Sequence, residues 1–320
     1  MNNLHIKSIK GKETLTNLVN KLLDHCEIEK NQSPKTRENY KHYLGRFLDF
    51  IPNNLKPHQI DLDLVQDYRL HLNRIKDKRG EPLAKKTQNY HIIALRVFLR
   101  FLAKNDIESL AADKIDLIKN PDREIDFLDR EEVERLFAAL DPKSKTFLRD
   151  RAILETLYST GLRVSELRRL NVDKVDTKNR EFFIVGKGGK SRIVFISPHC
   201  AEVIESYINS RKDNLKPLFL NLRTQSKEIE IDEEKGRLTT VAIQNIVRNT
   251  ALKSGIVKKV TPHVLRHSFA TDLLRNGADI RSVQELLGHA SINTTQIYTH
   301  ITNPKLRETY DKHHRSEKKP

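Results

Sequence analysis

Apolar residues recur at the spacing of an amphipathic helix throughout the first third of the chain. The pattern predicts four helices, over residues 14–27, 34–51, 61–75 and 85–104. The second helix has a clear start signal, because Ser33 suits the N-cap and Pro34 suits the first helical position. We therefore expect residues 1–118 to fold as a small all-helical domain.

The fourth predicted helix has an apolar face and a basic face. The residues expected to point inward are Ile93, Val97, Phe98, Phe101 and Leu102. The bases expected on the other side are Lys85, Lys86, Arg96, Arg100 and Lys104. A solvated helix face explains these bases as well as a surface that binds a polyanion does.

A second domain is predicted to begin at residue 127, after a polar linker over residues 119–126. Glu132 stands three residues after Asp129, which is the spacing of a capping box at the start of a helix. We therefore assign residues 127–320 to the second domain.

The second domain combines predicted helices with one predicted β-hairpin. Helices are expected over residues 146–159, 164–170, 198–212 and 239–254. Two β-rich runs, 181–185 and 191–196, lie on either side of a glycine-rich turn and indicate a hairpin. The charged residues 222–237 indicate an exposed loop, and Gly277 and Gly288 are expected to interrupt a helical remainder. The predicted fold class is therefore mainly α with a small β-hairpin.

The charge of the chain points to a polyanionic partner. The net charge is +15 and the pI is about 9.6. Residues 1–120 carry +7 and residues 121–320 carry +8, so the excess is spread over both domains. A nucleic acid that touches both domains explains this distribution, and a merely soluble basic protein is the alternative.

Membrane and secreted proteins are less consistent with the sequence. No stretch approaches the roughly 18 consecutive apolar residues of a membrane helix, and the N-terminus lacks the apolar run of a secretory signal. Cys26 and Cys200 are the only cysteines, too few for a disulfide framework or a four-cysteine zinc site. We expect a cytoplasmic protein with reduced thiols.

Six residues of the second domain carry candidate chemistry: Arg163, Lys187, His263, Arg266, His289 and Tyr298. Taken one at a time, they have ordinary structural explanations as a capping arginine, a solvated turn lysine, packed histidines and a core tyrosine. Together, however, arginine, histidine and tyrosine side chains can hold an anion, move a proton and attack a phosphate.

Several other kinds of site do not fit the sequence. The glycine-rich turn at 186–190 lacks the Gly-Lys-Ser/Thr ending and the following helix of a P-loop. No serine lies in a Gly-x-Ser-x-Gly elbow. The histidines do not form an H-E-x-x-H or Cys–His pattern, so a metal site has no support.

The order of the six residues resembles the tyrosine recombinase (phage integrase) family. The resemblance is carried by the segments TGLRVSEL, GKGGKSR, TPHVLRHSFAT and LLGHASINTTQIYTH. It covers about residues 14–312 and is strongest to the Xer branch. It implies an N-terminal helical core-binding domain with a SAM-like fold, followed by a C-terminal catalytic domain.

The resemblance implies how bonds and protons move. Tyr298 matches the nucleophile that attacks a DNA phosphate, forms a 3′-phosphotyrosyl bond and leaves a free 5′-hydroxyl. Lys187 matches the general acid that protonates the leaving 5′-oxygen, and His263 matches the residue that handles the tyrosine proton. The resemblance implies no metal ion, no ATP and no other cofactor.

The resemblance also implies how the phosphate is held. Arg163 and Arg266 match a clamp on the non-bridging oxygens, and His289 matches a further phosphate donor. Candidate DNA contacts outside this set are Lys85, Lys86, Arg96, Arg100, Lys190 and Arg192.

The implied partners are duplex DNA and other recombinase protomers, four of them on two DNA sites and either identical or of two kinds. Residues 302–314 are similar to a tail helix that docks on a neighbouring protomer, and packing on its own domain is the alternative. The expected function is site-specific recombination, in chromosome or plasmid dimer resolution or in mobile-element integration and excision. A DNA-binding protein of this fold that does not cut, or a topoisomerase, would share much of the sequence pattern.

Overall fold

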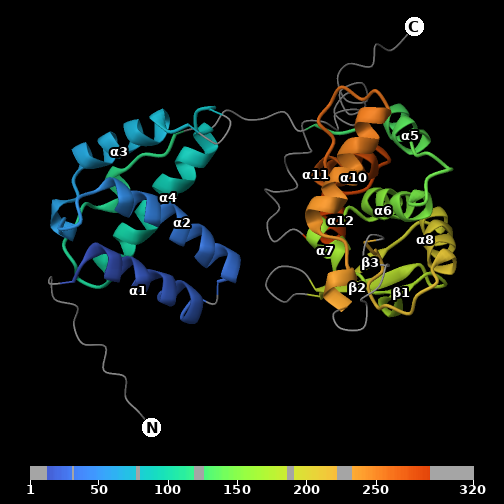
Figure 1. Cartoon of the computed structure of the whole chain (residues 1–320), viewed down its shortest axis with the longest axis horizontal. Coiled ribbons are helices and arrows are strands. Elements are labelled where there is room, and N and C mark those ends of the chain that lie inside the picture. Colours follow the sequence, from blue (N-terminus) through green and yellow to red (C-terminus); the bar gives the residue numbers. More distant parts are fainter. Residues whose placement is uncertain are drawn as a thin grey trace, which may run out of the picture. The chain divides into compact units, whose positions relative to one another are not determined.

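The computed structural model describes residues 13–30, 32–76, 80–118, 126–185, 191–221 and 233–288. The chain divides into two compact units, Met1–Arg123 and Glu124–Pro320 (Figure 1). No helix among the described residues is both long enough and apolar enough to cross a membrane.

The described part of the first unit is a bundle of four α-helices, as the apolar pattern predicts. They are α1 (Leu15–Ile28), α2 (Pro34–Phe50), α3 (Leu62–Arg74) and α4 (Lys85–Lys104). Two short 3₁₀ helices, Pro57–Gln59 and Ala112–Lys114, complete the described part of the unit. The start of α2 is confirmed, because the Ser33 hydroxyl accepts the Thr36 amide at 3.2 Å and Pro34 is the first helical residue.

Helix α4 is the centre of the first core, although one detail of its predicted face is wrong. Phe98, Phe101 and Leu102 are buried as expected. The same core also takes the fully buried Leu95 and Leu99. Val97 is half-buried and packs against this core, and Ile93, predicted to point inward, is also only half-buried. Because α4 packs against α1, α2 and α3, its apolar face is wider than a single stripe would suggest.

His91 on α4 is a buried histidine held in its neutral form. Arg46 lies 3.4 Å from Nε2, and Nδ1 lies 3.3 Å from the Tyr68 hydroxyl and 3.4 Å from the Tyr43 carbonyl. Burial lowers the pKa of His91 to about 4, and the positive charge of Arg46 contributes to the shift.

The first unit should therefore lose stability in acid. The unfolded chain takes up a proton on His91 near pH 6.5, whereas the folded unit takes it up near pH 4, so stability falls as the pH drops between these values. The loss should reach about 3 kcal/mol in the free energy of unfolding. Urea unfolding of the full chain, followed through NMR signals of α4, should show it. His91→Gln should flatten this dependence, whereas His58→Gln, at an exposed histidine, should not.

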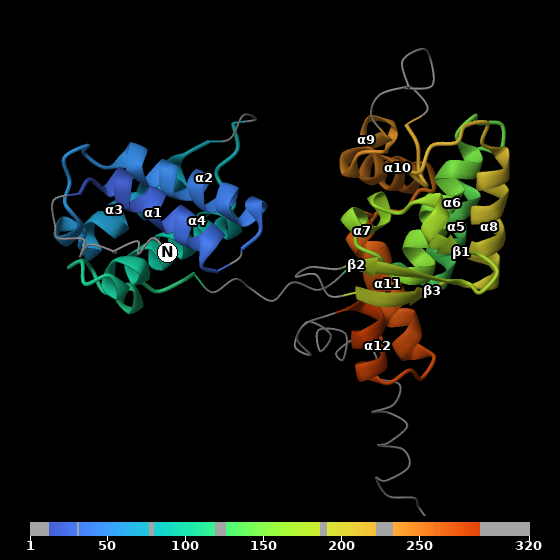
Figure 2. The same cartoon turned by 90° about the horizontal axis from the view of Figure 1, so that it is seen from below.

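The second unit contains eight described α-helices and one small sheet. The helices are α5 (Arg130–Ala138), α6 (Phe147–Thr160), α7 (Val164–Arg168), α8 (Pro198–Ser210), α9 (Glu233–Gly236), α10 (Thr240–Lys253), α11 (Pro262–Arg275) and α12 (Ile280–Leu287). The capping box at the start of α5 is confirmed, because Asp129 and Glu132 each accept the other's backbone amide. Helix α6 runs alongside α8 and also packs against α11 (Figure 2).

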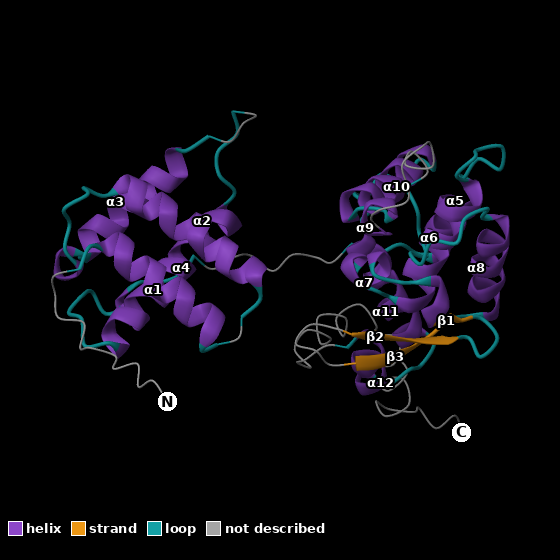
Figure 3. Cartoon of the chain, turned by 60° about the horizontal axis from the view of Figure 1, so that its bottom comes forward, coloured by secondary structure: helices purple, strands orange, loops and turns teal. Residues whose placement is uncertain are grey.

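Among the described residues the sheet is antiparallel and has three strands rather than two. Its strands are β1 (Val175–Asp176), β2 (Glu181–Val185) and β3 (Ser191–Phe195), in the order β1-β2-β3. The predicted hairpin is confirmed by the ladder from Glu181↔Phe195 to Val185↔Ser191. The two-residue strand β1 was not predicted, because so short a run has no alternating pattern. The sheet lies at one end of the unit, beside α12 (Figure 3).

The predicted exposed loop over residues 222–237 is partly wrong. Its end forms α9, and Arg237 is buried rather than exposed. The Arg237 guanidinium donates to the carbonyl oxygens of Arg168 and Leu170 at 2.9 and 3.0 Å, and pairs with Glu234 at 3.0 Å. The two carbonyl partners lie 69 and 67 residues earlier in the sequence, so the local charge pattern could not reveal them.

Candidate active site

Arg163 is placed by the tight junction between α6 and α7. Gly161 ends α6 with a left-handed φ of 60°. A Cβ atom there would lie 2.5 Å from the Phe269 ring, so only glycine fits this position. Two residues later Arg163 caps α7, with one third of its side chain exposed. The junction therefore presents a guanidinium group at the surface from a rigid backbone.

Glu166 fixes the Arg163 side chain and was not among the residues predicted from the sequence. Its Oε1 accepts from Arg163 Nη1 at 2.8 Å, and its Oε2 accepts from the Arg163 backbone amide at 2.9 Å. Arg192 on β3 donates to the same two oxygens at 3.2 and 3.0 Å. Burial alone would raise the pKa of Glu166, but the hydrogen bonds from Arg192 and Arg163 lower it overall. The i,i+3 spacing of Arg163 and Glu166 was the available sequence signal for this pair.

Arg266 is buried in α11, with only 4% of its surface exposed. Helix α11 begins at Pro262, where the Thr261 hydroxyl accepts the Val264 amide at 3.3 Å. Arg266 Nη1 donates to the Gly161 carbonyl at 2.6 Å, and Nη2 donates to the Leu287 carbonyl at 2.7 Å. Arg266 therefore joins the C-terminal ends of α6 and α12, and one of its bonds lies two residues from Arg163.

His263 lies one turn before Arg266 on α11, and its side chain is exposed. Although much of His263 is open to solvent, the surrounding protein removes part of its hydration and lowers its pKa, and the positive charges of Arg266 and Arg163 lower the pKa further. Its imidazole is therefore neutral at pH 7 and able to accept a proton. His267, one turn later, is half-buried, and burial together with positive charge from protonated His263 and from Arg266 lowers its pKa to about 4.

The structure therefore brings Arg163, His263 and Arg266 together at the C-terminal end of α6. Lys187, His289 and Tyr298 lie outside the described residues, as does Lys190. Within the part of the chain that is described, no three His, Cys, Asp or Glu side chains gather as a metal site would require.

The candidate DNA contacts of the first unit differ in their surroundings. Lys85 and Lys86 are exposed at the start of α4. Arg96 and Arg100 both face Asp113, at 3.5 and 2.9 Å. The Asp113 carboxylate offsets part of the positive charge that the sequence pattern assigns to this helix face.

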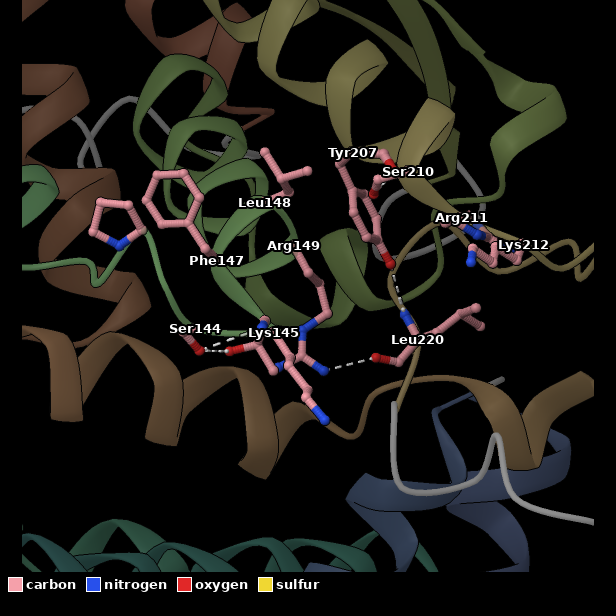
Figure 4. Close-up of a pocket in the computed structure, with 12 residues that line it drawn as sticks. Ser144, Lys145, Phe147, Leu148, Arg149, Tyr207, Ser210, Arg211, Lys212 and Leu220 are labelled. Atoms are coloured by element: carbon pink, nitrogen blue, oxygen red, sulfur yellow. Dashed lines mark hydrogen bonds between the residues drawn. The ribbon is translucent and has the colours of Figure 1, made fainter.

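A pocket of about 740 Å³ lies at the opposite end of α6 from Arg163 (Figure 4). The lining includes Lys145, Arg149, Tyr207, Arg211 and Lys212. Helix α6 has 14 residues, so its two ends are roughly 20 Å apart. Arg149 is already bonded to Asp150 and to the Leu220 carbonyl, and Arg211 to Asp213. This pocket is therefore separate from the candidate active site, and its arginines stabilise the fold.

Comparisons with known proteins identify the family. The sequence profile described as Phage integrase family matches residues 126–304, and the profile described as Phage integrase SAM-like domain matches residues 14–110. Tyrosine recombinase XerD of Oceanobacillus iheyensis is 38% identical over 290 residues, which span 90% of this chain and 94% of that protein. The chain belongs to the tyrosine recombinase family.

Further relatives place this recombinase in the Xer branch. Tyrosine recombinase XerC of Bacillus subtilis is 35% identical over 303 residues, which span 94% of this chain and 97% of that protein. The crystal structure of XerA recombinase aligns with a TM-score of 0.51 and 32% identity, over 93% of this chain and 99% of that one. The Tn1549 transposon integrase in complex with transposon right end DNA aligns with a TM-score of 0.73 and 18% identity, over 93% and 100% of the two chains, and supports the fold alone.

The family match confirms the fold class predicted from the sequence: an N-terminal SAM-like helical unit followed by a recombinase catalytic unit.

Proposed function

We propose that this recombinase cuts and rejoins duplex DNA at specific sites through a 3′-phosphotyrosyl intermediate. The observation that carries the proposal is the convergence of Arg163, Arg266 and His263 at the end of α6, in a chain that aligns with Xer recombinases over nine tenths of its length. Two cations and a neutral base at one point suit an anionic phosphate and a proton transfer.

Arg163 and Arg266 form the clamp on the scissile phosphate in this proposal. A guanidinium group is planar, always charged and able to donate two parallel bonds to phosphate oxygens. Arg266 donates to two carbonyl oxygens, and these bonds fix the orientation of its guanidinium group. Each clamp donor should stabilise the phosphorane-like transition state by about 3–4 kcal/mol, because that state carries more negative charge than the phosphate.

The bond changes balance without an external energy source. The Tyr298 oxygen forms a bond to phosphorus, and the bond from phosphorus to the 5′-oxygen breaks. Lys187 gives a proton to the leaving 5′-oxygen, His263 accepts the tyrosine proton, and His289 donates to the phosphate. The phosphotyrosyl bond keeps the energy of the phosphodiester, so the 5′-hydroxyl of another strand can reverse the step.

The proposed partners are duplex DNA and further protomers of a recombinase. Similar chains have been solved as XerH bound to difH substrate and as a lambda integrase dimer bound to a COC′ core site. The net charge of +15 suits binding to phosphates and predicts a steep salt dependence. Four protomers would act on two DNA sites, with residues 302–314 docking on a neighbour. Leu306 and Tyr310 are four residues apart in this segment and would form its apolar anchor.

The experiment that tests this function begins with selection of bound duplexes from a random pool. Two copies of the selected sequence are then placed on one supercoiled plasmid. A site-specific recombinase should exchange the DNA between the copies and yield deleted or inverted products. Relaxed plasmid without exchange would favour a topoisomerase, and bound but unchanged plasmid would favour a DNA-binding protein that does not cut.

A further inference from the structure

Arg192 and Arg163 share one buried carboxylate. Glu166 has 6% of its surface exposed, and each of its oxygens accepts a bond from both arginines. The distances from Glu166 to Arg192 are 3.2 and 3.0 Å, the parallel geometry in which a guanidinium group binds a carboxylate most strongly. The Glu166 carboxylate is therefore shielded from water and shared by two positive charges, of which Arg163 remains partly exposed.

The charge balance of this cluster decides what Arg163 can do. With both arginines present, the cluster keeps one net positive charge, and Arg163 is the more exposed of the two at 33% against 14%. Without Arg192, the charges of Glu166 and Arg163 would cancel, and the carboxylate would turn fully toward Arg163 as its remaining partner. A neutral Arg163–Glu166 pair attracts a phosphate far less than Arg163 does when Arg192 already balances the charge of Glu166.

The packing around Arg192 fixes the position of its side chain beside Glu166. Its strand β3 pairs with β2, and Arg192 lies opposite Ile184 in that ladder. Gly288 packs directly against it, since a Cβ atom on Gly288 would lie 2.7 Å from Arg192 Nη1 and 3.0 Å from its Cδ. Arg192 therefore connects the β2–β3 hairpin, helix α7 and the end of α12.

We propose that Arg192 is a positioning residue of the recombination reaction, which balances the charge of Glu166 so that Arg163 remains oriented and cationic toward the scissile phosphate. This role replaces the direct DNA contact expected from the sequence. It rests on the proposed function, because it requires Arg163 to act on a phosphate.

The test uses a duplex of the selected sequence in two forms, with an ordinary scissile phosphate or with an uncharged methylphosphonate there. Single-turnover cleavage and DNA affinity are measured for Arg192→Gln, Arg192→Lys, Glu166→Gln and the double variant Arg192→Gln/Glu166→Gln. Arg248→Gln, at an exposed arginine on α10, is the control that removes the same charge elsewhere. Arg163→Ala reports on the clamp itself.

Arg192→Gln should slow cleavage of the phosphate by about 10- to 100-fold, less than the 10²–10³-fold expected for loss of a direct donor. The methylphosphonate should be much less affected, because its transition state has less negative charge to stabilise. Adding Glu166→Gln should restore part of the lost rate, since it removes the carboxylate that neutralises Arg163. Arg192→Lys should be intermediate, because it keeps the charge but not the two parallel bonds.

Three results would overturn the role of Arg192. In the first, Arg192→Gln lowers the slope of log affinity against log salt concentration by about 0.9 but leaves cleavage of bound DNA unchanged. Arg192 would then be a phosphate contact. Equal losses on both substrates, or no recovery in the double variant, would make it a purely structural residue. If Arg163→Ala itself fails to discriminate between the two substrates, the proposed clamp is wrong, which is a separate failure.

Discussion

Tyr298→Phe is expected to abolish the covalent protein–DNA adduct while DNA affinity remains unchanged. The substitution removes one oxygen, which is the atom that would bond to phosphorus, and keeps the ring. The cleavage rate should fall by more than about 10⁴-fold, as for other covalent nucleophiles. The measurement is denaturing electrophoresis after incubation with a nicked duplex of the selected sequence, alongside a filter-binding titration.

Tyr158→Phe is the matched control for this prediction. Burial, together with the nearby Asp272 and Glu155 carboxylates, raises the pKa of Tyr158 to about 12, so its hydroxyl is a poor source of phenolate. This variant should form the adduct at the normal rate. An adduct that persists in Tyr298→Phe would mean that another residue is the nucleophile.

Lys187→Ala is expected to slow cleavage of ordinary DNA by about 10²–10⁴-fold, the usual contribution of a general acid. The loss should disappear on a duplex that has sulfur in place of the bridging 5′-oxygen. A thiolate leaves without receiving a proton, so the reaction no longer needs the lysine. The measurement compares single-turnover rates on the two duplexes for the wild-type chain and the variant.

Lys178→Ala provides the control for the lysine experiment. Lys178 is exposed in the turn between β1 and β2, at the opposite end of the hairpin from the glycine-rich turn. Its removal should change neither rate. If Lys187→Ala is equally slow on both duplexes, the lysine does not protonate the leaving group.

The parts of the fold that sequence could predict are those set by neighbouring residues. Ser33 and Asp129 mark helix starts because each side chain caps an amide three residues away. Gly288 marks the end of α12 because the backbone there has a φ of 62°. The β2–β3 hairpin follows from two β-rich runs on either side of glycines. In each case the cause and the effect lie within a few residues.

The parts that sequence could not predict depend on partners far along the chain. Glu166 matters because Arg192, 26 residues later, shares its carboxylate with Arg163. Arg237 is buried because it donates to two backbone carbonyl oxygens, which lie 67 and 69 residues earlier in the sequence. Arg266 reaches the Gly161 carbonyl across 105 residues. A motif can indicate that such residues matter, but only the packed structure shows what each one contacts.

The candidate site illustrates both limits. The order of motifs was sufficient to select Arg163, His263 and Arg266, which the structure brings to one end of α6. It gave no indication that Arg266 also joins two helix ends, or that Arg163 shares its carboxylate partner with a second arginine. These connections mean that substitutions in the cluster should change catalysis together rather than independently.

The most direct test of the account is to identify the residue and the DNA end in the covalent complex. A nicked duplex of the selected sequence releases a short strand after cleavage, so the adduct accumulates and its peptides can be sequenced by mass spectrometry. We predict that the nucleotide is attached to Tyr298 through a 3′-phosphate, and that the released strand has a 5′-hydroxyl that a kinase labels directly. Attachment to any other residue, or a released strand with a 5′-phosphate, would contradict the proposed mechanism.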